Sequence, residues 1–167
     1  MRIMKSDQNL RALSVRVGRR LLDQGLLLAT AESCTGGWVA KAVTDIAGSS
    51  QWFVEGWVTY GNASKQARLG VPAAILKRQG AVSEPVVAAM ARGALRSSGA
   101  HVALAVSGIA GPGGAVPGKP VGTVWFAWAR RSGSRVDVRT DCKRFRGDRE
   151  AVRAAAVRCA LRGILAL

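Results

Sequence analysis

A short stretch of carboxyl, hydroxyl, thiol and glycine residues, Glu32 to Gly37, lies between two segments of predicted regular structure. The apolar run 26–29 before it predicts a buried strand, and the segment after it predicts a helix. Ser33 offers a hydroxyl nucleophile, while Gly36 and Gly37 let a ligand approach the main chain. The unpaired N–H groups of a helix start can bind an anion or an oxyanion. The spacing therefore predicts a reactive turn at the end of a strand.

Two more turns rich in glycine and hydroxyl groups follow predicted strands, at residues 60–65 and 107–119. Open α/β sheets bind ligands at strand ends, so the three turns are expected to converge on one pocket. The longer turn is one residue short of a P-loop, and Pro120 stands where a Ser or Thr should bind magnesium. This argues against an ATPase. The glycine N–H groups can still hold a phosphate or an amide, and an ordinary crossover loop is the alternative.

A serine nucleophile needs a base, and the chain offers two candidates. The only histidine, His101, opens a predicted strand at the end opposite Ser107, which indicates a structural or exposed role. Lys65 follows Tyr60 after a tight turn, so both side chains can point back toward the strand end. A desolvated lysine can accept a hydroxyl proton, and a nearby tyrosine can relay it. The alternatives stay open here: Ser33 as a helix N-cap, Tyr60 as a strand-end aromatic residue and Lys65 as a solvated lysine.

Cys34 is the rival nucleophile, because the pKa of a thiol at a helix N-terminus is expected to fall. Without a histidine partner it ranks below Ser33. Glu32 is expected either to orient the Lys65 amine or to bind substrate. The three cysteines are widely separated and form no CxxC pair, which indicates free thiols rather than a zinc site. No metal site is therefore expected.

Composition indicates a single folded domain over residues 1–167, with 1–7 as a flexible terminus. No segment approaches the roughly 20 apolar residues of a membrane span, and the N-terminus lacks the apolar core of a secretory signal. A cytoplasmic location is therefore expected. The formal net charge is +15, with an excess of arginine in residues 130–167. Such charge favours polyanions or phosphorylated small molecules, and a solvated basic face is the alternative.

Hydrophobic periodicity predicts helices and strands in alternation. Helices are expected at 8–24, 35–46, 62–69, 72–79, 83–98 and 148–167, and strands at 26–30, 52–60, 101–106, 121–129 and 135–141. Asn62, Ser83 and Asp148 are the expected N-caps of three of these helices. This order predicts an α/β fold, a three-layer α/β/α sandwich with a mixed sheet.

Five segments resemble, in order, motifs of the CinA C-terminal domain family of nicotinamide-nucleotide amidohydrolases. They are residues 31–37, 58–62 with Lys65, 80–83, 106–114 and 119–124, and the segment 145–153 also fits. The resemblance covers residues 10–165, and it implies the same sandwich fold. It implies hydrolysis of the carboxamide of nicotinamide mononucleotide to nicotinate mononucleotide and ammonia, without a metal or other cofactor.

The resemblance also implies roles for individual residues. Ser33 would be the nucleophile and Lys65 its general base, with Tyr60 assisting proton transfer. Main-chain N–H groups near Thr35 and Gly36 would stabilise the oxyanion, a contribution of about 3–4 kcal/mol per donor. Substrate would be bound by the first turn, the third turn and a basic helix: Glu32, Thr35, Gly36, Gly37, Ser107, Gly108, Ile109, Ala110, Gly111, Gly113 and Arg149. Arg149 is the expected partner of the phosphate, with Arg153 as the second candidate.

A second interpretation of the chain is a basic non-catalytic module that binds a nucleotide or DNA, linked to competence or DNA damage. The arginine excess in residues 130–162 motivates it. However, the tryptophans lie in apolar strand-like segments rather than among exposed basic residues. Nucleic-acid binding is therefore expected only as a non-specific charge effect, and no membrane partner is expected. Trp52, Phe53 and Trp57 near a strand edge favour a homodimer.

Overall fold

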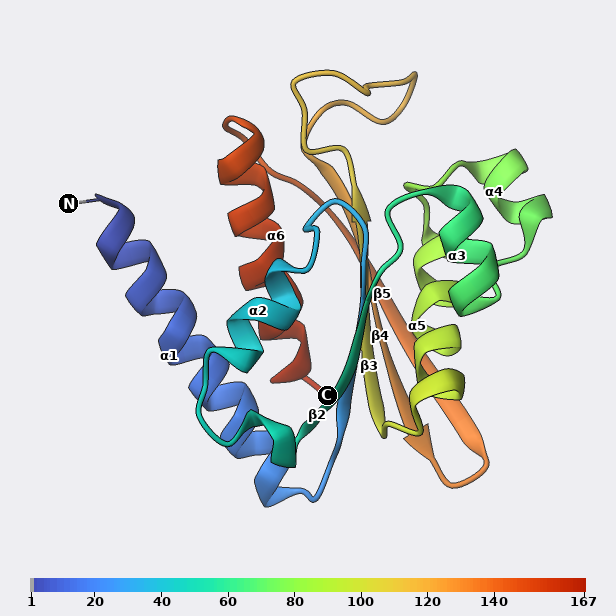
Figure 1. Cartoon of the computed structure of the whole chain (residues 1–167). Helices are drawn as coiled ribbons and strands as arrows, with labels where there is room; N and C mark the ends of the chain where they lie inside the picture. The colour runs from blue at the N-terminus through green and yellow to red at the C-terminus, as the bar shows by residue number, and fades with distance from the viewer. Residues whose placement is uncertain (1) are drawn as a thin grey trace.

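The computed structural model describes residues 2–167, with side chains from Asn9 onward, and Met1 lies outside the described residues. Within them, helices and strands follow one another in the predicted order (Figure 1). The helices are α1 (Arg2–Asp23), α2 (Trp38–Thr44), α3 (Asn62–Leu69), α4 (Ala73–Gln79), α5 (Glu84–Ser98) and α6 (Arg149–Ile164), with a short 3-10 helix η1 (Ser49–Gln51). The strands are β1 (Leu28–Glu32), β2 (Phe53–Val58), β3 (Val102–Gly108), β4 (Thr123–Ser132) and β5 (Arg135–Arg144).

The strands form one mixed sheet in the order β2-β1-β3-β4-β5. β1 runs parallel to both β2 and β3, with Glu32 opposite Val58 on one side and Val106 on the other. β4 and β5 continue the sheet as an antiparallel hairpin. Because parallel strands end at the same edge, the segments that follow β1, β2 and β3 leave the sheet side by side. These segments are the three turns at which the sequence predicts chemistry.

Helices cover both faces of the sheet, which confirms the predicted three-layer α/β/α sandwich (Figure 1). α1, α2 and α6 pack on one face, around a core that includes Val17, Val43 and Leu161. α3, α4 and α5 pack on the other face, around Leu69 and Met90. Strand β3 contributes side chains to both cores, because its buried residues alternate between the two faces of the sheet. Within residues 2–167, no helix combines the length and apolar content that a membrane span requires.

Several predicted boundaries need correction. α1 begins at Arg2, so the segment predicted as a flexible terminus, 1–7, is helical from its second residue onward. The helix predicted from residue 35 begins only at Trp38, because an irregular turn precedes it. Strand β1 extends beyond its predicted end to Glu32, which pairs with both neighbouring strands. The acidic side chain therefore lies inside the sheet rather than in the turn.

The predicted N-caps differ in outcome. Asp148 caps α6 as predicted, and its carboxylate accepts a hydrogen bond at 2.9 Å from the main-chain N–H three residues later. Gly61 rather than Asn62 is the N-cap of α3, because Asn62 is already helical. Ser83 is the N-cap residue of α5, but its hydroxyl donates to the Gly80 carbonyl at 2.8 Å instead of accepting from the helix.

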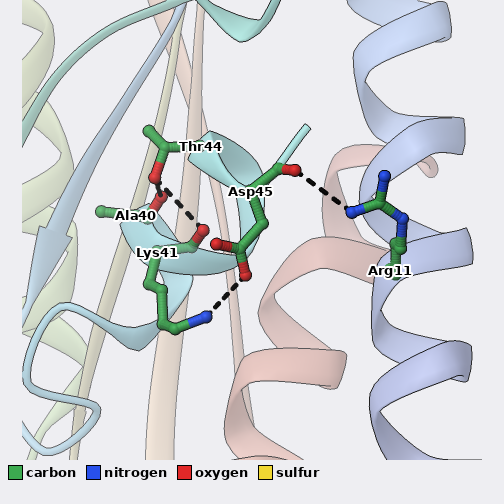
Figure 2. A network of polar contacts seen from close by, with 5 residues as sticks. All are labelled: Arg11, Ala40, Lys41, Thr44 and Asp45. Carbon is green, nitrogen blue, oxygen red and sulfur yellow. Dashed lines mark hydrogen bonds and ion pairs between the residues drawn. The ribbon is translucent and has the colours of Figure 1, made fainter. Parts of the chain in front are cut away.

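Polar contacts fix the far end of α2, the helix that follows the reactive turn (Figure 2). Lys41 and Asp45, one helical turn apart, form an ion pair at 2.6 Å. Arg11 of α1 donates to the Asp45 main-chain carbonyl at 3.2 Å, and the Thr44 hydroxyl donates to the Ala40 carbonyl at 2.8 Å. The Arg11 bond joins the end of α2 to α1, and the other two bonds stabilise the last turn of α2 itself.

A close contact between Gly163 and Trp128 sets α6 against β4. A Cβ atom at Gly163 would overlap the indole ring, so only glycine fits. The indole N–H donates to the Ala160 carbonyl at 2.8 Å, and the Arg139 guanidinium lies 4.8 Å from the ring centroid. With α6 fixed along β4, its first two turns lie beside the residues that follow β1.

Candidate active site

Ser33 directly follows β1 at the edge where the parallel strands end. Its N–H donates to the Val106 carbonyl of β3 at 3.0 Å, which extends the strand pairing by one residue, and Ser33 is 8% exposed. The Gly36 N–H donates back to the Ser33 carbonyl at 3.0 Å and closes a tight turn. α2 starts later, with Gly37 at its N-cap and no side-chain cap. The alternative in which Ser33 caps the helix is therefore wrong.

The Glu32 carboxylate supplies the missing cap of α2 from within the sheet. Three main-chain N–H groups donate to it at 2.8–3.1 Å, those of Gly37, Val39 and Ala40. The Thr35 hydroxyl donates to the same carboxylate at 2.6 Å. A helix start leaves such N–H groups without partners, and its positive end favours a carboxylate. Glu32 thus holds the turn and α2 together. The prediction that it orients the Lys65 amine is wrong, because that amine contacts Ser33 and two main-chain carbonyls instead. Substrate binding by Glu32 stays a prediction.

Lys65, in α3, reaches Ser33 through the interior. Its side chain is fully buried, so the alternative of a solvated lysine is wrong. The amine lies 3.1 Å from Ser33 Oγ, 2.7 Å from the Thr59 carbonyl oxygen and 2.9 Å from the Tyr60 carbonyl oxygen. Both carbonyls belong to the turn that leaves β2. Strand β1 therefore positions the hydroxyl, while β2 and α3 together position the amine.

The three contacts of the Lys65 amine determine where its lone pair points. A carbonyl can only accept, so the Thr59 and Tyr60 carbonyls each take one N–H. A neutral amine has two N–H groups and one lone pair, and the lone pair then faces the Ser33 hydroxyl. Burial lowers the pKa of Lys65, which favours this neutral form. The arrangement can therefore take the proton of Ser33.

Cys34 lies in the same turn without being an activated thiol. Its side chain is buried, and burial raises the pKa of Cys34 to about 12. The nearby Glu32 carboxylate raises this pKa further, and the opposing influences of a main-chain hydrogen bond, Arg153 and Lys65 are smaller than that of burial. The prediction that the helix start lowers this pKa is therefore wrong. At neutral pH the thiol keeps its proton, whereas the thiolate is the nucleophilic form.

Tyr60 contacts different partners through its main chain and its side chain. Its carbonyl accepts from Lys65, while its side chain is 57% exposed and its hydroxyl accepts a hydrogen bond from Arg149 at 2.9 Å. Arg149 also donates to the Gly111 carbonyl at 2.7 Å. Arg149 thus links the turn after β2 to the loop after β3. Among the described residues, the Tyr60 hydroxyl makes no hydrogen bond to Ser33 or Lys65.

Arg153, one helical turn beyond Arg149, contacts the main chain of the reactive turn. Its guanidinium donates to the Cys34 carbonyl at 3.1 Å and to the Thr35 carbonyl at 3.0 Å. The same group lies 5.5 Å from the centroid of the Trp38 ring. Arg153 is half-buried whereas Arg149 is exposed, so Arg149 is the more accessible of the two predicted phosphate partners.

The loop after β3 is partly interior. Its buried members are Ser107, Ile109, Ala110 and Gly111, Gly108 is half-buried, and Gly113 is exposed. The Ser107 hydroxyl donates to the Ala81 carbonyl at 2.9 Å and so binds the protein itself. A Cβ atom at Gly108 would lie 2.7 Å from the side chain of Val124. The exposed residues of this loop therefore begin at Pro112.

Two main-chain N–H groups of the reactive turn, those of Cys34 and Thr35, donate to no main-chain carbonyl of the described residues. The sequence predicts oxyanion donors near Thr35 and Gly36, but the Gly36 N–H already donates to the Ser33 carbonyl. The pair without a main-chain acceptor is therefore one residue closer to the nucleophile. Main-chain groups leave no side-chain signal, so this shift could not be read from the residue types.

His101 has the structural role that the sequence predicts. Its Nδ1 accepts a hydrogen bond at 3.0 Å from the Leu27 N–H at the amino end of β3, the end away from Ser33. Throughout the part of the chain that the structure describes, no group of three His, Cys, Asp or Glu side chains could hold a metal ion.

Comparison with known proteins finds relatives of similar length and longer ones that the chain covers only in part. A family model described as CinA C-terminal domain matches residues 10–167. The chain is 53% identical to the nicotinamide-nucleotide amidohydrolase PncC of Escherichia coli K12 over 156 residues, which cover 93% of each protein. It is 57% identical over 145 residues to a CinA-like protein of Akkermansia muciniphila, covering 87% of this chain but only 34% of that relative. The chain thus spans about a third of the longer relative.

Solved structures of similar proteins share the fold over nearly the whole chain. The competence damage-inducible protein A of Klebsiella pneumoniae matches with a TM-score of 0.88 at 42% identity, covering 93% of this chain and 94% of that one. The competence/damage inducible protein CihA of Agrobacterium tumefaciens matches with a TM-score of 0.87 at 43% identity, covering 94% of each. With the family model matched over residues 10–167, the chain belongs to the CinA C-terminal domain family.

Proposed function

We propose that the protein is an amidohydrolase that converts nicotinamide mononucleotide to nicotinate mononucleotide and ammonia, in the cytoplasmic recycling of pyridine nucleotides. The observation that carries the proposal is the buried Lys65 amine, 3.1 Å from Ser33 Oγ and oriented by two carbonyls. A serine beside a neutral amine base is a nucleophile suited to acyl transfer. The full-length relatives named nicotinamide-nucleotide amidohydrolase support the substrate.

The first half of the reaction acylates Ser33. Its Oγ attacks the carboxamide carbon while the hydroxyl proton passes to the neutral Lys65 amine, 3.1 Å away. The carbonyl oxygen takes the electron pair of its double bond and becomes an oxyanion. When this intermediate collapses, the carbon–nitrogen bond breaks and the nitrogen takes the proton from the Lys65 ammonium. Ammonia leaves, and Ser33 carries a nicotinoyl ester.

The second half reverses these roles. A water molecule attacks the ester carbon and gives a proton to Lys65, whose amine is neutral again. Collapse of the second intermediate breaks the bond to Ser33 Oγ, which takes the proton back. The products are nicotinate mononucleotide and the original neutral base, so the Ser33–Lys65 pair is restored.

The oxyanion of both intermediates is stabilised by the Cys34 and Thr35 N–H groups in this mechanism. They follow Ser33 directly and donate to no main-chain carbonyl of the described residues. Donors aimed at developing charge act without reorganisation, and the loss of one typically slows catalysis by about 100- to 1,000-fold.

Substrate binding falls to the groups at the mouth of the site. Arg149 uses two of the roughly five N–H donors of a guanidinium for Tyr60 and Gly111, so donors remain for the nucleotide phosphate. The exposed Tyr60 ring and the exposed residues Pro112 and Gly113 complete this mouth. Glu32 and the Thr35 hydroxyl shape the site from behind.

Ammonia release by the purified protein tests this proposal. Wild type incubated with nicotinamide mononucleotide should yield equal amounts of ammonia and nicotinate mononucleotide. Ser33→Ala should lower kcat by more than about 1,000-fold, because the nucleophile is lost. The matched control is Ser50→Ala, at an exposed serine outside the site, which should retain full activity. Absence of turnover by wild type, or undiminished turnover by Ser33→Ala, would refute the proposal.

We also propose that two copies of the chain associate through the open edge of β2. Trp52 is 1% exposed and belongs to the core, so it is not the interface residue that the sequence predicts. Val54 and Val58 on β2 are instead exposed, at 45% and 51%. The opposite edge strand, β5, carries six charged residues, whereas β2 carries only Glu55. Charged side chains protect a sheet edge from pairing, so β2 is the edge left for association.

A further inference from the structure

The guanidinium of Arg153 forms hydrogen bonds with the main-chain carbonyls of the two residues that follow the nucleophile. It donates to the Cys34 carbonyl at 3.1 Å through Nε and to the Thr35 carbonyl at 3.0 Å through Nη2. These are side-chain contacts from α6 to main-chain atoms more than 100 residues earlier in the chain. Two fork-like donors on two successive carbonyls leave that stretch of backbone little freedom to rotate.

The orientation of one carbonyl also determines the orientation of the next N–H. The peptide bond between Cys34 and Thr35 is trans, so the Cys34 carbonyl and the Thr35 N–H point in opposite directions. Arg153 binds the carbonyl side of this unit. The Thr35 N–H therefore faces away from the guanidinium, and it donates to no main-chain carbonyl of the described residues. Proton donation toward the carbonyl also polarises the peptide unit and strengthens its N–H as a donor.

Two neighbouring residues, Trp38 and Gly36, favour the observed position of the Arg153 guanidinium. The face of Trp38 lies 5.5 Å from the guanidinium and favours its flat orientation. Gly36 has a φ of +61°, and a Cβ atom there would lie 3.3 Å from Arg153 Nη2. A glycine at this left-handed position thus leaves room for the guanidinium.

We propose that Arg153 is a positioning residue, which orients and polarises the Thr35 N–H as an oxyanion donor while it contacts neither substrate nor nucleophile. The inference rests on the proposed amidohydrolase function. It differs from the phosphate-binding role that the sequence assigns to Arg153 as second candidate, because it predicts a change in kcat rather than in KM.

Steady-state kinetics of Arg153→Ala and Arg153→Lys, with Arg158→Ala as the matched control on α6, test the inference. Arg153→Ala should lower kcat by about 10- to 100-fold with KM within about twofold, as expected when a group that orients another is lost. Arg153→Lys keeps the charge but not the fork, and it should fall between Arg153→Ala and wild type. Arg158→Ala should match wild type. A raised KM with unchanged kcat would overturn the inference in favour of phosphate binding.

Two further measurements separate positioning from a role in folding. Added guanidinium ion should restore part of the kcat of Arg153→Ala, and it should leave Arg158→Ala unchanged. The rate at which a phosphonyl fluoride labels Ser33 should fall in parallel with kcat, because its oxygen occupies the same oxyanion position. A loss of activity that follows a lowered melting midpoint, without rescue by guanidinium, would overturn the inference.

The two proposals fail in different ways. If wild type neither releases ammonia from nicotinamide mononucleotide nor reacts with the phosphonyl fluoride at Ser33, the proposed function fails. If wild type does both and Arg153→Ala behaves as Arg158→Ala does, the amidohydrolase stands and the role of Arg153 is refuted.

Discussion

Lys65 serves Ser33 as a base only while its amine is uncharged, and burial is what makes that state accessible. The side chain is fully buried, so the charged form loses hydration that the two carbonyls only partly replace. The pKa of Lys65 is lowered as a result. The charge state of this single amine therefore couples the activity of the site to pH.

The pH dependence of kcat/KM should follow the deprotonation of Lys65 in the free enzyme. Because the neutral form is active, kcat/KM should rise with pH and level off above the pKa of Lys65 in the folded protein. Burial lowers that pKa, so the midpoint of the rise should lie below the ordinary value for lysine. Stopped assays between about pH 6 and about pH 10 measure it. A rate that is independent of pH over this range would contradict the assignment, and Lys65→Arg should be inactive throughout.

A substitution at Tyr60 distinguishes a role in substrate binding from a role in proton transfer. Its hydroxyl contacts Arg149 at 2.9 Å, so Tyr60→Phe should loosen Arg149 and raise KM severalfold with little change in kcat. A proton relay through Tyr60 would instead lower kcat by about 100-fold or more. Arg149→Met should raise KM in the same way, and the double variant should be little worse than Arg149→Met, because the two side chains act together.

At the scale of elements, the site depends on the junction between β1 and α2. Glu32 is the last residue of β1, and its buried carboxylate holds the first N–H groups of α2. The far end of α2 is tied to α1 through Arg11 and Asp45 (Figure 2). The reactive turn thus connects strand β1 to helix α2, and both ends of α2 are held by hydrogen bonds.

Replacement of Glu32 by Gln should test this junction. An amide group keeps one acceptor oxygen but presents N–H groups where the carboxylate accepted, so at least one charge-assisted hydrogen bond is lost. The free energy of unfolding should fall by about 2–3 kcal/mol. Urea denaturation measures it, with Glu55→Gln on the exposed strand β2 as the control. Equal stability of the two variants would show that the cap has no structural role.

Elements were more predictable from the sequence than the contacts between them. The order of helices and strands, the Asp148 cap and the structural His101 follow from patterns that act over a few residues. The role of Glu32 could not be predicted, because its partners are main-chain N–H groups exposed only once α2 starts at Trp38. The meeting of Ser33 with Lys65 depends on the strand order, which places β1 beside β2.

At the scale of the whole molecule, several arginines of the basic segment 130–167 form internal contacts. Arg130, Arg131 and Arg139 donate to main-chain carbonyls, and the Arg139 guanidinium also lies over Trp128. Arg149 and Arg153 are engaged around the site. Nucleic-acid binding as a non-specific charge effect stays a prediction. Salt-sensitive association without sequence preference is its expected form.

The contrast between the two sheet edges leads to a prediction about association. Val54→Lys places a charge on β2, one residue from its start, and should shift the protein from dimer toward monomer, as measured by analytical ultracentrifugation. Asp137→Lys places the same side chain on β5 and should leave the distribution unchanged. If wild type is monomeric, or if the variant on β2 remains dimeric, association through this edge is refuted.

The groups that orient the base in this site are different from the side chains that we expect to bind substrate. The carbonyls of residues 59 and 60 direct the base, and a carbonyl is present whatever side chain a residue carries. The side chains of Tyr60 and Arg149 can therefore be exchanged without changing the atoms that direct the base. Libraries built at these two positions should yield variants that accept other carboxamides while they retain the Ser33–Lys65 pair. The fold thus offers a scaffold whose substrate range can be redesigned independently of its chemistry.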